Sequence, residues 1–144
     1  MHSLTENCEF RYVNDAVAAA NNTDDNSTRI DMQGYESVTF IVPITDSVAT
    51  GVATLTIQEN SADSDTGMTA VTGTASTATS AANDDLNGTL LIAEYRNPGE
   101  RYVQGTITSA TANIAFGATV AILKPYRRPA TQGSTVSDTE YVSN

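Results

Sequence analysis

Residues 37–44, Ser-Val-Thr-Phe-Ile-Val-Pro-Ile, form the stretch of sequence that decides the fold class. Its large apolar residues recur at every second position, a period that is typical of a β-strand. The intervening positions are also fairly apolar, which predicts cover on both faces of this strand. Pro43 has no backbone N–H to donate, so its position is expected at a sheet edge or at a strand end.

Similar runs lie on both sides of this stretch, and turn residues separate them. Strands are expected at residues 28–32, 52–59, 68–72, 90–95, 102–109 and 119–123. Only residues 15–20 have a slightly helical pattern. Many short strands at this spacing predict an all-β chain that folds as an antiparallel β-sandwich or as a jelly-roll-like barrel.

The chain has 144 residues, which is the length of one ordinary domain. We expect a β-sandwich domain at residues 27–125, between an extended N-terminal arm at residues 1–26 and an extended C-terminal arm at residues 126–144. Pro125 and Pro129 break regular structure at the second boundary, and the residues that follow are polar and have short side chains.

Both expected arms carry aromatic or basic residues outside the strand core. Tyrosine and arginine are frequent anchors of protein interfaces. The residues expected to contact partner proteins are Phe10, Tyr12, Val13, Tyr126, Arg127 and Arg128. The sequence therefore predicts that the two arms carry the interface.

The chain is acidic, with a formal net charge of −10 and an isoelectric point of about 4.2. Such a charge repels phosphate backbones and anionic membranes, so neither nucleic acid nor a membrane is an expected partner. Lys124, Arg127 and Arg128 lie close together, and we interpret them as a solvated or protein-docking edge. No apolar run approaches the roughly 20 residues that a membrane-spanning helix needs.

The cysteine content and the first residues bear on whether the chain is a small secreted domain. Cys8 is the single cysteine, so no internal disulfide can form. The first residues lack the basic start and apolar centre of a signal peptide. The chain is therefore not expected to belong to the small secreted domains that disulfides stabilise.

The candidate catalytic chemistry is sparse. His2 is the only histidine, and it lies at an end that is expected to be mobile. Nucleophile–histidine arrangements, and transition-metal sites built from histidine and cysteine, need a histidine in fixed geometry. No glycine-rich phosphate-binding motif is present. We therefore expect no enzymatic activity, no catalytic residue and no cofactor.

A small-ligand module is the alternative from a different functional class. Asp63 and Asp65, with Asp84 or Asp85, are candidate calcium ligands, because Ca²⁺ prefers carboxylate oxygens. The EF-hand spacing fails, since the twelfth residue counted from Asp63 is Thr74 rather than a glutamate. A carbohydrate-binding face would need aromatic platforms, for which the candidates are Tyr35, Tyr95 and Tyr102.

Residues 31–40, Asp-Met-Gln-Gly-Tyr-Glu-Ser-Val-Thr-Phe, resemble a segment of small virion proteins encoded among tailed-phage head genes. Later pieces at residues 55–61, 101–104 and 125–135 fit the same layout, so the resemblance covers about residues 28–135. The run of Thr, Ala and Ser at residues 74–82 departs from it and leaves the local sheet pairing open.

The resemblance implies a capsid decoration, or cement, protein. Such proteins lie on the outer surface of the shell, often as dimers or trimers, and tie neighbouring capsid subunits together. The expected partners are thus the major capsid protein and further copies of this chain, and the expected location is the virion, after synthesis in the cytoplasm of a bacterial host. A neck, head–tail joining or tail protein is the alternative, which the copy number per virion would separate.

Overall fold

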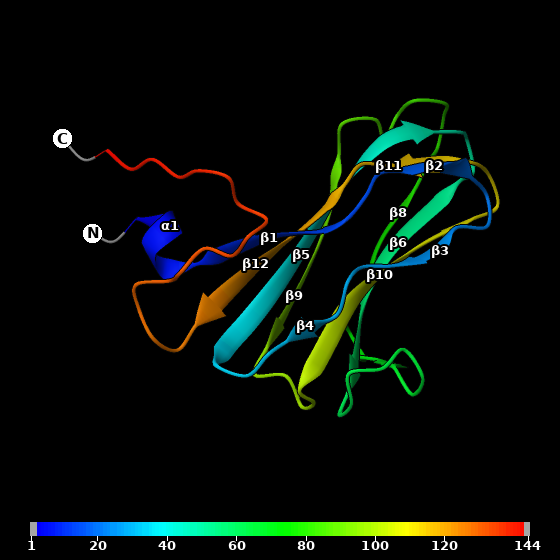
Figure 1. The fold of residues 1–144 in the computed structure, drawn as a ribbon. Coiled ribbons are helices and arrows are strands. Elements are labelled where there is room, and N and C mark those ends of the chain that lie inside the picture. Colours follow the sequence, from blue (N-terminus) through cyan, green and yellow to red (C-terminus); the bar gives the residue numbers. More distant parts are fainter. Residues whose placement is uncertain (1–2, 143–144) are drawn as a thin grey trace.

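Two antiparallel β-sheets pack face to face and form a sandwich (Figure 1). The structure is a computed structural model, and it describes residues 3–142. The first sheet contains β1 (Glu9–Asn14), β2 (Val17–Ala20), β5 (Tyr35–Ser47), β9 (Leu90–Arg96), β11 (Ile114–Phe116) and β12 (Thr119–Pro125). The second sheet contains β3 (Asp24–Asn26), β4 (Ile30–Asp31), β6 (Val52–Asn60), β7 (Thr69–Ala70), β8 (Ser76–Thr79) and β10 (Tyr102–Ala110). The expected all-β sandwich is confirmed.

One short helix, α1 (Leu4–Asn7), precedes the sandwich. The Ser3 hydroxyl accepts the backbone N–H of Glu6 at 3.1 Å, and the Glu6 carboxylate accepts the backbone N–H of Ser3 at 3.3 Å. With four residues, α1 is far too short to cross a membrane, and no other helix occurs in residues 3–142.

β5 is the central strand of the first sheet. It pairs with β9 on one side and with β12 and then β11 on the other, and β1 and β2 continue outward from β12 and β11. Pro43 lies inside this strand, so the expected sheet edge or strand end at this position is wrong. The break is in the partner instead: β12 leaves β5 where Val120 pairs with Ile41, and β11 joins it where Phe116 pairs with Ile44. The missing N–H of the proline therefore costs no strand hydrogen bond.

β10 and β6 form the centre of the second sheet. β3 and β4 pair with the outer side of β10, and β7 and β8 pair with the outer side of β6. The small residues of the segment at 74–82 therefore form part of an edge strand, β8, along β6.

The core lies between the two sheets. β5 contributes Val38, Phe40, Val42 and Ile44, which are all 0% exposed, as the period-two pattern predicted. The outer face of this strand is only half-buried, so the cover expected on that side is incomplete. The core is completed mainly by aliphatic side chains of β6, β10, β11 and β12.

Residues 1–26 were expected to form an arm, and the structure places most of them in the sandwich. β1 pairs with β12, β2 with β11 and β3 with β10, so residues 9–26 belong largely to sheet strands. The slightly helical pattern at residues 15–20 gives an extended strand, β2. Partner strands supply the backbone hydrogen bonds here, and this tertiary pairing outweighs the helix propensity of alanine. His2 lies outside the described residues.

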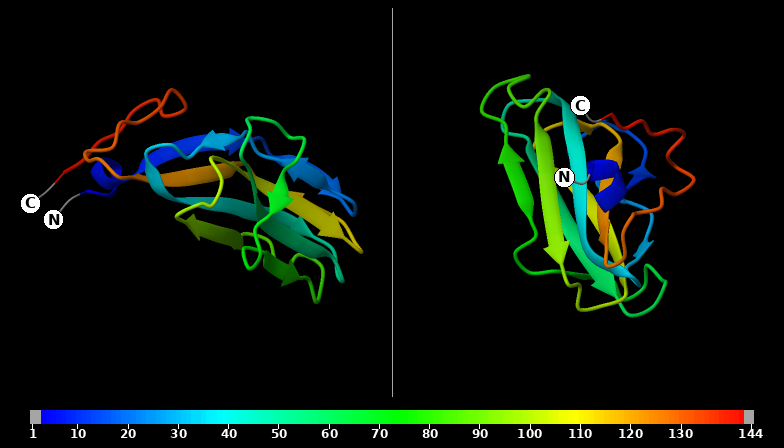
Figure 2. Two further views of the ribbon diagram at one scale, coloured as in Figure 1. Left: turned by 90° about the horizontal axis from the view of Figure 1, so that it is seen from below. Right: turned by 90° about the vertical axis from the view of Figure 1, so that its left-hand side faces the viewer.

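Residues 126–142 contain no helix or strand and run back along β1. Figure 2 shows this C-terminal segment beside α1 and the start of β1, at one end of the molecule. The Gln132 side chain ties the two together: its Oε1 accepts the backbone N–H of Phe10 at 2.9 Å, and its Nε2 donates to the carbonyls of Thr5 and Cys8 at 3.0 and 2.8 Å. The C-terminal segment is therefore attached to the edge of the first sheet.

Candidate functional site

Tyr126, Arg127 and Arg128 follow directly on β12 and form an exposed turn, which we call the docking loop. The backbone N–H of Tyr126 donates to the carbonyl of Gly34 at 3.0 Å, which fixes where the loop begins. The Tyr126 side chain is 64% exposed. A large aromatic side chain is thus held at the surface, next to two arginines.

The arginines of the docking loop differ from the other basic residues of the chain. Of the seven lysines and arginines, five form ion pairs: Arg11, Arg29, Arg96, Arg101 and Lys124. Arg127 and Arg128 form no ion pair with any described residue. On an acidic chain, the two unpaired cations therefore lie together and beside an exposed tyrosine.

Two shallow hollows flank the docking loop. One, of about 500 Å³, is lined by Glu9, residues 33–35, residues 125–127 and residues 129–131. The other, of about 430 Å³, is lined by Met32, Gln33, Tyr35, residues 97–101 and Tyr126. Tyr126 lines both hollows, so its side chain borders each of them.

A buried charged cluster forms the floor of the first hollow. Glu9 is 4% exposed, and its Oε1 accepts Arg11 Nε at 2.7 Å, while the Tyr35 hydroxyl donates to its Oε2. Burial raises the pKa of Tyr35, and the Glu9 carboxylate raises it further. Burial acts to lower the pKa of Arg11, but Glu9 and Tyr35 together more than offset this effect and the pKa is raised. The cluster thus holds a charged pair in place beneath the C-terminal segment.

The predicted interface residues of the N-terminal part are divided by the pleat of β1. Phe10 is half-buried and Tyr12 is 47% exposed, and both point to the outer face of the first sheet. Val13 is 3% exposed and belongs to the core, so its expected place in an interface is wrong. Since β1 is a strand and not a free arm, successive side chains alternate between solvent and core.

The structure does not bring Tyr12 and the docking loop together. Tyr12 pairs with Val120 near the start of β12, whereas the docking loop follows its end at Pro125. Tyr12 belongs instead to a row across the outer face of the first sheet, in which Val120 pairs with Ile41 and Ile41 with Ile92. The exposed Ile92 was not among the predicted site residues.

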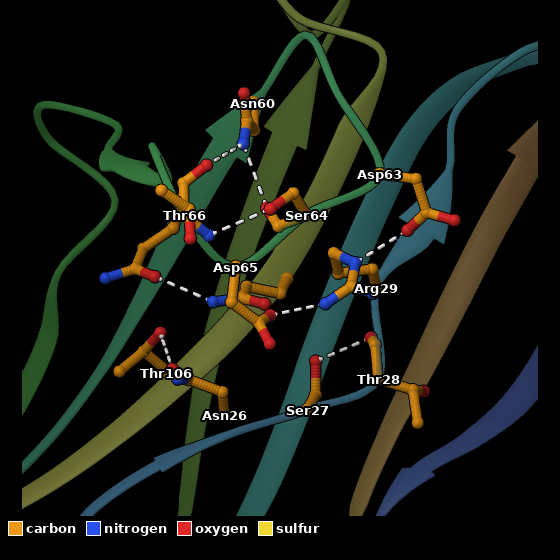
Figure 3. Close-up of polar contacts among 12 residues, drawn as sticks. Asn26, Ser27, Thr28, Arg29, Asn60, Asp63, Ser64, Asp65, Thr66 and Thr106 are labelled. Carbon is orange, nitrogen blue, oxygen red and sulfur yellow. Dashed lines mark hydrogen bonds and ion pairs between the residues drawn. The ribbon is translucent and has the colours of Figure 1, made fainter.

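The candidate calcium ligands do not converge. Arg29 Nε lies 2.6 Å from Asp63 Oδ1, and Asp65 forms an ion pair with the same guanidinium (Figure 3). Asp85 lies near the opposite end of β6, where its carboxylate accepts the Ser80 hydroxyl at 2.7 Å. Within residues 3–142, no group of three His, Cys, Asp or Glu side chains is placed to hold a metal ion.

The loop that carries Asp63 and Asp65 is instead fastened by protein groups. Asn60 Nδ2 donates to the carbonyls of Ser64 and Thr66, both at 2.9 Å (Figure 3). Together with the Arg29 contacts, these bonds fold the loop back toward the end of β6. The two carboxylates therefore have a structural partner of opposite charge.

The three candidate platform tyrosines are each engaged within the molecule. Tyr35 donates to Glu9, and the Tyr95 hydroxyl donates to Glu59 Oε2 at 3.0 Å. The Arg101 guanidinium lies over the Tyr102 ring, 5.3 Å from its centroid. In each of the three, a hydroxyl or a ring face that a sugar would use is thus already in contact with another side chain.

Acid is expected to destabilise the fold through two surface carboxylates. Lys124 holds the pKa of Glu36 below its usual value, and Arg101 does the same for Asp31. A folded-state pKa below the unfolded value gives stability that is present above about pH 4 and is lost as the pH falls through the folded pKa. The melting temperature should therefore stay level from neutral pH to about pH 5 and fall below about pH 4. Glu36→Gln should melt lower at neutral pH and lose less on acidification, and an equal acid loss in both proteins would contradict this.

No protein-family model matches the chain, and no curated protein matches it. Among solved structures, the PBSX exported protein XepA aligns with 99% of this chain and 46% of its own length, at 14% identity and a TM-score of 0.55. The chain thus spans less than half of that protein, and at this identity the match shows a shared β-sandwich fold.

Two further matches are weaker. The structure of infectious bursal disease virus, Gx strain, aligns with 82% of this chain and 32% of its own, at 12% identity and a TM-score of 0.45. The CBM22-1–GH10 modules of Clostridium thermocellum endo-1,4-beta-D-xylanase 10B align with 95% of this chain and 29% of their own, at 13% identity and a TM-score of 0.45.

Proposed function

We propose that this chain is a structural protein of a phage virion that binds the outer surface of the capsid and bridges neighbouring capsid subunits. The docking loop is the observation that carries the proposal. Tyrosine and arginine dominate binding energy at protein interfaces. Here an exposed tyrosine adjoins the two basic residues that have no ion-pair partner among the described residues.

The charge of the docking loop defines the partner surface. A pair of unpaired arginines is attracted to an acidic surface, whereas the rest of this acidic chain is repelled by it. That contrast favours one orientation, in which the end of the sandwich that carries the docking loop faces the shell. The partner is accordingly an acidic patch on the outer surface of the major capsid protein.

The virion location rests on the sequence resemblance at residues 28–135 to small proteins encoded among tailed-phage head genes. A cement protein needs a stable sandwich and a surface for docking, and it needs no active site. A bridging role also needs at least two docking loops in each bound oligomer, and self-association of the chain supplies these. Many weak contacts on a repeating lattice then bind tightly through multivalency.

Co-sedimentation with capsids of the source phage, stripped of this protein, tests the proposal. We expect saturable binding at a copy number comparable with that of the capsid subunits. The double variant R127Q/R128Q should bind at least about tenfold more weakly, because both unpaired charges at the contact are lost. The matched control is R29Q, which removes a cation from an ion pair elsewhere and should bind like the wild type.

The outcomes separate the alternatives. If R127Q/R128Q binds capsids as tightly as the wild type, the docking loop does not contribute to the contact with the capsid. About six or twelve copies per particle would indicate a neck or tail ring, because such rings close by cyclic symmetry. Absence of binding to both shells and tails would overturn the virion assignment.

A further inference from the structure

Each sheet of the sandwich has two edges, and three of these four edges are protected. Unpaired strand edges invite pairing with other chains, and proteins block them with short strands or with covering segments. In the second sheet, the edge strands have only two to four residues each: β3 has 3, β4 has 2, β7 has 2 and β8 has 4. In the first sheet, β1 and β2 together form one edge. β2 has only 4 residues, and the C-terminal segment covers β1, where the backbone N–H groups of Phe10 and Tyr12 donate to Gln132 Oε1 at 2.9 Å and Thr135 Oγ1 at 3.3 Å.

β9 is the unprotected edge. It runs for seven residues without a break and pairs with β5 alone among the described strands, at the border of the first sheet (Figure 1). Leu90 and Ile92 on its outer face are 55% and 50% exposed. On the neighbouring β5, Pro43 and Ile41 lie directly beside them and continue the apolar surface. This edge therefore offers main-chain hydrogen-bonding groups together with an apolar surface.

The hydrogen bonds to β5 show which residues of β9 face outward. Ile44 N–H donates to the carbonyl of Thr89 at 2.9 Å, and Asn97 N–H donates to the carbonyl of Glu36 at 2.7 Å. Because bonded residues alternate along an antiparallel pair, the odd-numbered residues of β9 bond to β5. The backbone groups of the even-numbered residues, which include Leu90, Ile92 and Glu94, therefore point away from the sheet.

We propose that a second copy of this chain pairs with β9 in antiparallel orientation about a two-fold axis at Ile92. In this register Ile92 faces its own counterpart, and Leu90 faces Glu94 of the second copy. Three residue pairs then form about six main-chain hydrogen bonds, and the first sheets of both copies join into one. Placing the axis at Glu94 would set two like charges opposite each other, which disfavours that register.

The outward-facing residues of β9 suit a second copy because Ile92, the middle one of Leu90, Ile92 and Glu94, is uncharged and apolar and can face its own counterpart. Leu90 and Ile92 form the apolar half of β9, and Glu94 and Arg96 form its charged half. A two-fold axis at Ile92 brings the two Ile92 side chains together at the centre, sets one Leu90–Glu94 pair on each side of them and leaves Arg96 outside these three pairs. β8 lies next to β9 on this side of the sandwich, and its side chains are those of Ser, Thr and Ala.

Sedimentation or light scattering of the purified full chain, without capsids, tests the dimer. The wild type should give twice the chain mass of 15.2 kDa. Ile92→Lys places like charges on the axis, and Ile92→Pro removes an outward N–H without affecting β5, so both variants should be monomers with a folded circular dichroism spectrum. The matched control is Tyr12→Lys, an exposed position on the opposite edge, which should remain a dimer. A monomeric or trimeric wild type, or a dimeric Ile92→Lys, would overturn the proposal.

A cysteine on the axis tests the register independently of the mass. In a Cys8→Ser background, Ile92→Cys should cross-link with its counterpart on oxidation, because bonded antiparallel pairs lie at about 5.5 Å between Cα atoms. Glu94→Cys should not cross-link, and the reverse result would reject the axis at Ile92. Dimerisation through β9 would hold whether or not the chain binds a shell, so loss of capsid binding by R127Q/R128Q leaves it unaffected.

Discussion

Phe40→Ala is expected to lower the free energy of unfolding by about 3–5 kcal/mol, because it removes a fully buried ring from the centre of the core. The ring packs against β10 at Gly105, where a Cβ atom would lie 2.9 Å from Phe40 Cδ1. The absence of a side chain at Gly105 is thus what admits the ring. Urea unfolding followed by circular dichroism measures the loss, since the chain has no tryptophan to report it.

The contact between the Phe40 ring and Gly105 predicts that substitutions at these two positions have coupled effects on the free energy of unfolding. Gly105→Ala should cost about 1–3 kcal/mol alone, because the added methyl group collides with the ring. In the Phe40→Leu background the same substitution should cost less, since the smaller side chain frees space. Equal costs in both backgrounds would show that the ring does not press on Gly105. Thr39→Ala, on the half-buried outer face of the same strand, is the surface control and should cost well under 1 kcal/mol.

Local pattern predicted the strands that pack on both sides of the core. The alternation at residues 37–44 placed Phe40 inward, and β5 extends beyond that stretch at both ends, to Tyr35 and Ser47. The same reasoning failed for Val17–Ala20, because alanine carries little information and only pairing with β11 makes it a strand. Pro43 was misplaced for a similar reason, since the break that accommodates it lies in other strands.

The candidate surfaces were predictable to different degrees. Tyr126, Arg127 and Arg128 follow a strand and two prolines flank them, so their exposure could be expected from the sequence. Val13 was misassigned because the pairing of β1 with β12 depends on contacts more than 100 residues apart. Ile92 had a visible signal, a Leu-Leu-Ile run that is apolar on both faces of a strand. Its exposure follows from the position of β9 at a sheet edge, and strand order is not written in local sequence.

Glu9→Leu is expected to lower the free energy of unfolding by about 2–3 kcal/mol, because it leaves the Arg11 guanidinium without its carboxylate. The full cost of a broken buried pair is discounted here, since the Arg11 side chain is 28% exposed. The Tyr35 hydroxyl also loses its acceptor. Urea unfolding at neutral pH measures the effect, and Tyr35→Phe alone should cost less because the charge pair stays intact.

Restoring charge balance should separate electrostatics from packing. In the double variant Glu9→Leu/Arg11→Met no charge is left unpaired, and apolar replacements of buried pairs are often neutral or better. We therefore expect the double variant to be more stable than Glu9→Leu alone. A double variant that is less stable than Glu9→Leu would mean that the shape of the side chains, rather than their charge, limits stability at this site. The space is already tight there, since a Cβ atom at Gly133 would lie 3.0 Å from Glu9 Oε1. Because the C-terminal segment rests on this carboxylate, the charged pair would then serve mainly to seat that segment against β1.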